Sequence, residues 1–274
     1  MRPPEPVLVL DRYPEERARL LDLLHGLTAD RWDAPTACPG WSVKDLAAHL
    51  LADDLGRLSR QRDGYAGWAP RPGEDLLAFV NRQNEEWVQG ARRLSPGVLC
   101  DLLAWSGDRV AACFAALDQF ALDGTVSWAG PEPAPVWLDV AREYTERWHH
   151  QQHIREAVGA PPLTDSRLFA PVLATFVRAL PHALRDSDAP AGTAVGLRIE
   201  GASGGDWAAV REARGWTLYA GAPEGAAARV ALDEALAWRL FTRGIAPDEA
   251  APRATLEGDP ALCRLVLGMV AIIA

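Results

Sequence analysis

The chain has 274 residues, of which 49% are hydrophobic and 24% charged, and its formal net charge is −9 at pH 7. This length predicts two modest domains rather than one core. The acidic balance and the lack of a sustained Lys/Arg stripe argue against nucleic acid as a partner, because phosphate neutralisation supplies much of that affinity. No stretch approaches the ~20 apolar residues of a membrane span, and residues 1–10 lack the apolar core of a secretory signal, so a cytoplasmic protein is expected.

The first predicted helix covers residues 15–27, where leucines recur at helical spacing after Pro14, which suits a first helical position. A loop rich in helix-breaking residues follows at 34–40 and contains Cys38, one of four cysteines that form no C-x-x-C pair. A thiolate could be stabilised just before a helix start. Because no lysine or histidine neighbours Cys38 in sequence, however, we interpret all four cysteines as small structural residues.

A second helix begins after Ser42, whose side chain can accept a hydrogen bond from the backbone of Asp45. The side chain of Asp45 can in turn accept one from the backbone of Ser42, which is the pattern of a capping box. This helix carries His49 at the edge of an apolar stripe formed by Val43, Leu46 and Leu50. From that position His49 can face the interior. A lone histidine there is more often a structural residue than a ligand.

Three more helices are predicted in the first half of the chain, at residues 74–94, 95–117 and 135–158. The middle one begins at Ser95 and Pro96, a cap followed by proline in the first turn. Several long amphipathic helices indicate a bundle, in which metal sites are built from side chains of facing helices.

The last of these helices contains three of the chain's six histidines. Helical periodicity places Glu146, His150 and His153 on one face, and His149 with His153 forms an alternative pair. Imidazole and carboxylate together suit zinc or another late divalent metal. The alternative is a solvated polar face opposite an apolar stripe of Trp137, Ala141, Tyr144 and Trp148.

After residues 159–164 the pattern changes to an α+β module of about 100 residues, so we place the domains at 1–160 and 161–274. A helix at 166–184, bent or ended by Pro181, leads into short β-like runs. Asp233 caps a further helix through Phe241. The remaining expected elements are strands at 193–200, 207–211, 216–220 and 253–257, and a buried terminal helix at 262–274.

Two segments carry a resemblance to a known family. The block Cys38-Pro-Gly-Trp-Ser-Val-Lys-Asp-Leu-Ala-Ala-His49-Leu, followed later by Glu146-x-x-x-His150-x-x-x-Ile-Arg155, resembles the mycothiol-dependent maleylpyruvate isomerase family of the DinB-like superfamily. The second half resembles that family's C-terminal domain. The implied fold class is α+β with two domains: an N-terminal DinB-like up-and-down helical bundle, then a small sterol-carrier-like α+β domain.

The resemblance implies a divalent metal, most commonly zinc with nickel as the alternative, held by His49, Glu146 and His150. Water or the thiol of mycothiol or a related cofactor would take an open position. Many family members carry an acidic residue where this chain has His153. This substitution would either add a fourth ligand or remove an acid that orients His150.

Arg82 and Arg243 are weak candidates for contacts to substrate carboxylates, and the alternative for each is a solvated surface residue. The implied activity is cis-trans isomerisation of small unsaturated acids with a low-molecular-weight thiol. A mycothiol-dependent S-transferase and a non-catalytic metal-dependent binding or regulatory protein are the alternatives. The implied partners are a small-molecule thiol and a small organic substrate, and the sequence leaves the oligomeric state open.

Overall fold

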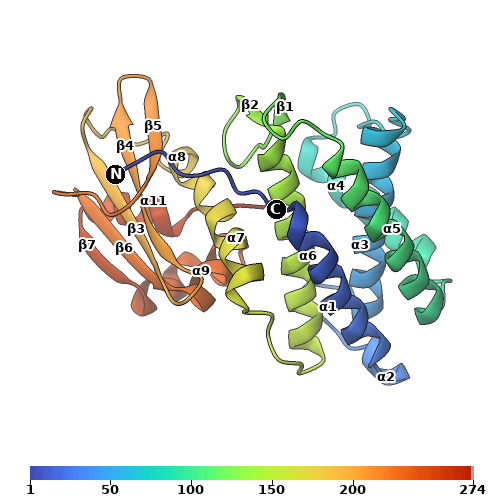
Figure 1. Cartoon of the computed structure of the whole chain (residues 1–274). Helices are drawn as coiled ribbons and strands as arrows, with labels where there is room; N and C mark the ends of the chain where they lie inside the picture. The colour runs from blue at the N-terminus through green and yellow to red at the C-terminus, as the bar shows by residue number, and fades with distance from the viewer. Residues whose placement is uncertain (273–274) are drawn as a thin grey trace. The chain divides into compact units, whose positions relative to one another are not determined.

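The computed structural model describes residues 1–272 and contains two compact units (Figure 1). One unit, here the helical unit, contains residues 9–118 and 143–163; the other, here the sheet unit, contains residues 1–8, 119–142 and those from 164 onward. The two-domain α+β class predicted from the sequence is confirmed. The sequence suggested one boundary, between residues 160 and 161, whereas both units consist of several segments.

The helical unit is formed by long helices joined by loops of varied length. Its elements are the 3-10 helix η1 (Leu10–Arg12), α1 (Tyr13–His25), α2 (Ala29–Trp32), α3 (Val43–Arg57), the π-helical turn η2 (Leu58–Arg62), α4 (Leu76–Ala91), α5 (Pro96–Ala115) and the second part of α6 (Val136–Ala157). Apolar residues from these helices form one buried core, which includes Leu20, Leu46, Leu50, Leu103 and Ile154. This core fixes α3 and α6, the helices that carry the candidate ligands.

The helix starts follow from local sequence. The capping box predicted at Ser42 is confirmed, because the Asp45 N–H donates to Ser42 Oγ at 3.3 Å and the Ser42 N–H donates to Asp45 Oδ2 at 3.0 Å. Ser95 caps α5 in the same way, by accepting from the N–H of Val98. Such caps satisfy backbone donors that have no partner inside the helix.

The sheet unit contains a two-stranded ribbon and a five-stranded mixed sheet of order β5-β4-β3-β6-β7, in which only the β3–β6 pair is parallel. Helices α8, α9 and α11 pack on strands of the larger sheet. The elements are β1 (Leu122–Thr125), β2 (Pro133–Pro135), α7 (Ser166–Phe176), η3 (Val177–Ala179), α8 (Leu180–Ala183), β3 (Ala194–Glu200), β4 (Gly205–Glu212), β5 (Gly215–Ala220), β6 (Ala228–Asp233), α9 (Glu234–Phe241), α10 (Pro247–Ala250), η4 (Ala251–Arg253), β7 (Thr255–Gly258) and α11 (Pro260–Leu267).

Some predicted elements need correction. The helix expected over 166–184 breaks earlier, after Phe176, and a 3-10 turn precedes α8. The break fits Pro181, whose ring conflicts with the carbonyl four residues before it. The sequence prediction missed β1, β2 and β6. The terminal helix ends at Leu267 rather than continuing, and residues 273–274 lie outside the described part of the chain.

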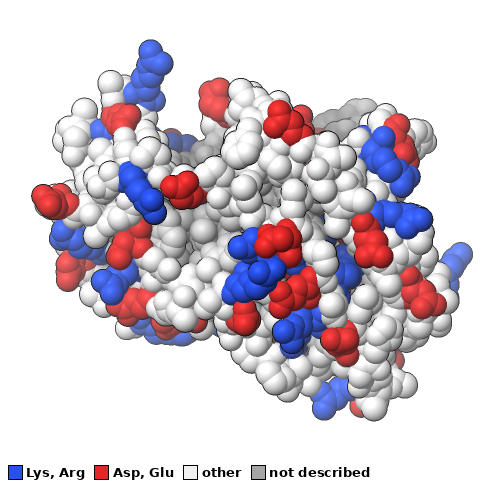
Figure 2. Space-filling view, in the orientation of Figure 1, with Lys and Arg blue, Asp and Glu red and all other residues white. Residues whose placement is uncertain are grey.

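Charged side chains of both signs are interspersed on the face shown in Figure 2, where neither sign forms a continuous patch. Within residues 1–272, no helix combines the length and the hydropathy that crossing a bilayer requires.

Candidate metal centre

Helices α3 and α6 bring His49, Glu146 and His150 together inside the helical unit. His49 lies almost two turns after the capped start of α3 and is 3% exposed. Glu146 and His150 are one turn apart on α6, so their side chains extend from the same face. His150 is also buried, so the sequence alternative of a solvated polar face does not describe it.

The ligand atoms of these three residues lie close enough to share one ion. Glu146 Oε1 is 3.0 Å from His150 Nε2 and 3.5 Å from His49 Nε2. Tetrahedral zinc with bonds of ~2.0–2.1 Å would separate such ligand atoms by ~3.3–3.4 Å. The two distances fall on either side of that value, and two imidazoles with one carboxylate form a donor set that zinc accepts. The residues therefore fit a divalent metal.

Without a metal, the three groups form a polar cluster in which both histidines are buried and Glu146 is half-buried. Burial by itself raises the pKa of Glu146, but His150 and His49 outweigh it and hold that pKa well below its usual range. Burial would lower the pKa of His150, yet attraction to Glu146 and a contact with Cys38 raise it to about 10. A proton on His150 thus occupies a position that a metal would take.

Asp53 is a site residue that sequence reasoning missed. It lies one turn after His49 on α3, and its Oδ2 is 3.6 Å from His49 Nε2. This distance is too long for a hydrogen bond, and the buried oxygen accepts none. Burial raises the pKa of Asp53, and repulsion from Glu143 and Glu146 adds to this effect while His49 opposes it. The i, i+4 spacing from His49 was the available sequence signal.

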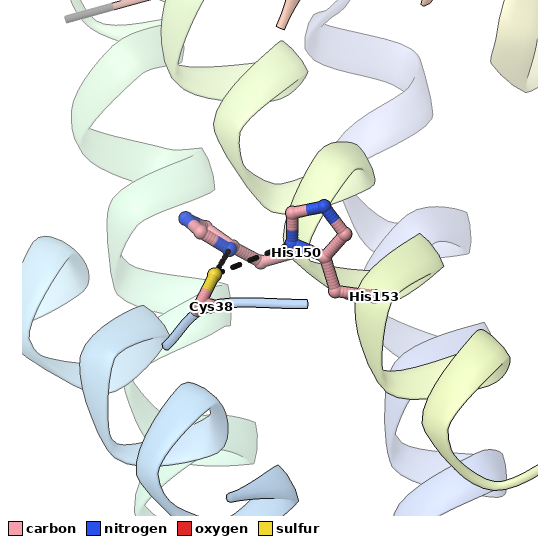
Figure 3. A group of neighbouring side chains, drawn as sticks. All are labelled: Cys38, His150 and His153. Atoms are coloured by element: carbon pink, nitrogen blue, oxygen red, sulfur yellow. Dashed lines mark hydrogen bonds between the residues drawn. The ribbon is translucent and has the colours of Figure 1, made fainter. Parts of the chain in front are cut away.

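His153 lies in a second group of potential ligands, with Cys38 and His150, rather than with His49 and Glu146 (Figure 3). Its Nδ1 is 3.5 Å from Cys38 Sγ. Cys38, interpreted from the sequence as structural, has two histidines as neighbours in space, although they follow it by more than a hundred residues. His149 packs its ring on those of His150 and His153.

The structure shows the local contacts of Arg82 and the backbone of Arg243, the two arginines named as candidates for substrate contacts. Arg82 on α4 forms a bidentate ion pair with Glu74, at 2.7 and 2.8 Å, and so already has a carboxylate partner. That contact lowers the pKa of Glu74 to about 2. Arg243 belongs to the sheet unit and follows α9 with a φ of 60°.

A buried charge network joins the two helices that carry the site. Asp54, next to Asp53, accepts from Arg147 Nη2 at 2.6 Å and from Arg17 Nη2 at 2.8 Å. Arg147, next to Glu146, also donates to Glu143. Since Asp54 and Arg147 are at most 1% exposed in their side chains, these bonds fix the rotation of α3 relative to α6. This rotation determines how His49 meets Glu146.

Comparison with known proteins gives relatives by sequence and, separately, similar solved structures. Two uncharacterized proteins of Mycobacterium tuberculosis, from strains CDC 1551 and H37Rv, are each 28% identical over 149 residues. The match covers 53% of this chain and 54% of either relative, so it spans about half the length of each.

Two similar solved structures show the same fold as this chain. The crystal structure of a mycothiol-dependent maleylpyruvate isomerase has a TM-score of 0.54 and 15% identity, covering 90% of this chain and 91% of that one. A histidine-to-alanine mutant of such an enzyme gives a TM-score of 0.53 at 16% identity and the same coverage. At this identity the likeness establishes a shared architecture.

The family is established by sequence. Residues 13–155 match the sequence model of the mycothiol maleylpyruvate isomerase N-terminal domain. The matched segment is more than half of the chain and includes His49, Asp53, Glu146, His150 and His153. The chain therefore belongs to the mycothiol maleylpyruvate isomerase N-terminal domain family.

Proposed function

We propose that this protein is a metal-dependent enzyme that uses mycothiol or a related thiol to convert small cis-unsaturated acids into their trans isomers. The observation that carries the proposal is the convergence of His49, Glu146 and His150, whose ligand atoms all lie within 4.8 Å of one another, in a member of this family. Two neutral imidazoles and one carboxylate would leave a net positive charge on a divalent ion. Such a centre favours an anionic fourth ligand or substrate.

A divalent metal at this position would lower the pKa of a coordinated thiol and so supply a thiolate near neutral pH. The protein's own groups hold and surround that centre. Glu146 contributes the negative charge, and the ring of Trp41 covers His49 at a centroid distance of 5.2 Å. Asp53, with its raised pKa and its unbonded Oδ2, is placed to take up or return a proton beside His49.

Cis-trans isomerisation of a conjugated acid is achieved by reversible addition of a nucleophile to the double bond. Addition converts the double bond into a single bond that can rotate, and elimination of the same nucleophile restores the double bond in the trans form. No atom or electron is gained overall. An S-transferase would share the addition and release the adduct instead.

Metal content tests the first part of the proposal. Protein purified without a histidine tag is analysed by elemental mass spectrometry as wild type, His150→Ala and Glu146→Gln. His25→Ala is the matched control, because His25 is an exposed histidine at the end of α1. We expect about one zinc or nickel ion per chain in the wild type and the control, and loss of the ion in the two site variants. Wild type that stays metal-free after incubation with zinc would overturn the proposal.

Activity tests the second part. The metal-loaded protein is mixed with mycothiol and maleylpyruvate, and the cis and trans acids are followed by proton NMR. We expect trans product only when both thiol and metal are present, with activity lost on chelation and restored by zinc. A thiol adduct that accumulates in place of the trans acid would identify the transferase instead. Binding of zinc with neither product would support a non-catalytic role.

A further inference from the structure

A second group of potential metal ligands lies next to the first and contains a sulfur. Figure 3 shows the sulfur of Cys38 directed at the rings of His150 and His153. Cys38 Sγ is 3.5 Å from His153 Nδ1 and 4.0 Å from His150 Nδ1. All three ligand atoms lie within 4.8 Å of one another, although the cysteine comes from the loop before α3 and the histidines from α6.

These distances suit a metal ion bound by one sulfur and two nitrogens. Bonds of ~2.3 Å to sulfur and ~2.0–2.1 Å to nitrogen at tetrahedral angles separate the sulfur from each nitrogen by ~3.5–3.6 Å. One observed distance equals this value, and the other is within a small movement of it. We propose that Cys38, His150 and His153 form a second metal site, selective for thiophilic ions such as cadmium or copper(I).

The loop that carries Cys38 is held in place before any ion arrives. Thr36 Oγ1 accepts from the Cys38 N–H at 3.2 Å and donates to the Trp41 carbonyl at 2.8 Å. Gly40, with a φ of 81°, makes the turn between Cys38 and Trp41. His150 and His153 are both 8% exposed, whereas Cys38 is only half-buried. The histidines are therefore ordered, and an ion can enter past the thiol.

The two sites share His150, and each site uses a different nitrogen of its ring. His150 Nε2 faces Glu146 at 3.0 Å, while His150 Nδ1 faces Cys38. A neutral imidazole binds a metal through one nitrogen and keeps a proton on the other, so occupation of one site disfavours the other. This competition rests on the proposed function of the first site, whereas the second site depends only on its own three side chains. A thiophilic ion held by Cys38 would thus inhibit the first centre.

Cobalt(II) spectroscopy tests the site directly, because sulfur-bound cobalt gives a near-ultraviolet charge-transfer band and cobalt bound only to nitrogen and oxygen does not. Cobalt(II) is titrated under reducing conditions into His49→Ala, which lacks a ligand of the first group, and into the double variants His49→Ala/Cys38→Ser and His49→Ala/His153→Ala. His49→Ala/Cys113→Ser is the matched control, since Cys113 is a half-buried cysteine outside both groups. We expect the band in His49→Ala and in the control, and its loss in the double variants that lack Cys38 or His153.

His49→Ala protein that binds cobalt without the band would overturn the proposal, as would a band that persists in His49→Ala/Cys38→Ser. Alkylation gives a second readout that needs no variant: cadmium should protect Cys38 from iodoacetamide, as peptide mass spectrometry can measure. Unchanged alkylation of Cys38 in the presence of cadmium would contradict the site. Failure of this proposal is distinguishable from failure of the proposed function, because zinc that is lost in Glu146→Gln but kept in Cys38→Ser supports the first centre whatever the outcome at Cys38.

Discussion

Replacing Asp54 with alanine should destabilise the helical unit more than any exposed substitution, because this carboxylate lies at the centre of a buried charge network. Asp54 is fully buried and accepts from Arg17 and Arg147, and also from Ser106 Oγ at 2.6 Å. Its loss leaves two buried guanidinium groups without a shared partner. Arg17 keeps the Leu103 carbonyl and Arg147 keeps Glu143, so neither cation is stripped of every bond.

Breaking a buried ion pair by removing one partner lowers the free energy of unfolding by about 3–5 kcal/mol. Since two arginines depend on Asp54, we expect a loss in the upper half of that range. With a urea slope of roughly 2–3 kcal/mol/M, the unfolding midpoint should fall by roughly 1.3–2.5 M. Urea titration followed by far-ultraviolet circular dichroism measures this shift.

Asp101→Ala is the matched control, because Asp101 is an exposed aspartate on α5. It should change the free energy of unfolding by no more than about 0.5 kcal/mol. Asp54→Asn keeps one acceptor oxygen and the shape of the side chain. Its loss of free energy of unfolding should therefore lie between those of Asp54→Ala and Asp101→Ala. A loss below about 1 kcal/mol in Asp54→Ala would refute the reasoning, since the remaining partners would then satisfy both arginines.

Further outcomes are expected for the proton on His150 and for two glycines. Zinc binding near pH 7 should release about one proton from His150, whose pKa in the metal-free protein is about 10, as calorimetry in buffers of different ionisation enthalpy can measure. The raised pKa also means that the proton on His150 stabilises the metal-free fold below its unfolded pKa of about 6.5, and that this contribution is lost as pH rises through about 10. Glu146→Gln should lower the pKa of His150, observed by NMR titration of its ring, and an unchanged value would contradict the pairing. Gly258→Ala should destabilise the sheet unit by at least about 1–3 kcal/mol, since Gly258 has a φ of 82° and an added Cβ would lie 2.1 Å from the Ala227 carbonyl. Gly90→Ala on the exposed side of α4 should instead stabilise by about 0.5–1 kcal/mol, and thermal unfolding distinguishes the two signs.

Local signals in the sequence predicted most of the helices. The predicted helix at 135–158 corresponds to α6 at Val136–Ala157, because a long periodic pattern is strong. The capping box at Ser42 was readable because all of its bonds form within four residues. Strand β6 was missed because its six residues, Ala228–Asp233, are stabilised by pairing with β3, which lies far back in the chain. Strand pairing over such a separation leaves only a short and weak local pattern.

In the candidate site, too, local features could be predicted from the sequence and long-range contacts could not. The spacing of Glu146 and His150 on one helix could be read directly, because helical periodicity determines it. The arrangement of Cys38 with His150 and His153 could not be read, because those histidines follow it by 112 and 115 residues. The bond between Asp54 and Arg147 likewise spans 93 residues, so the two charges look solvated in sequence although both are buried. Tertiary packing alone brings these groups together.

The interleaving of the two units has a consequence for synthesis on the ribosome. The helical unit cannot be completed until residue 163 has emerged, because its last segment is 143–163. The sheet unit includes residues 1–8, and Arg2 pairs with Ala220, so residues 1–8 must wait for a strand that is made much later. The residues that follow at 9–118 can begin to associate in the meantime. The order of translation therefore lets the helical unit become compact before the sheet unit, which residues 1–8 can join only after residue 220 has emerged.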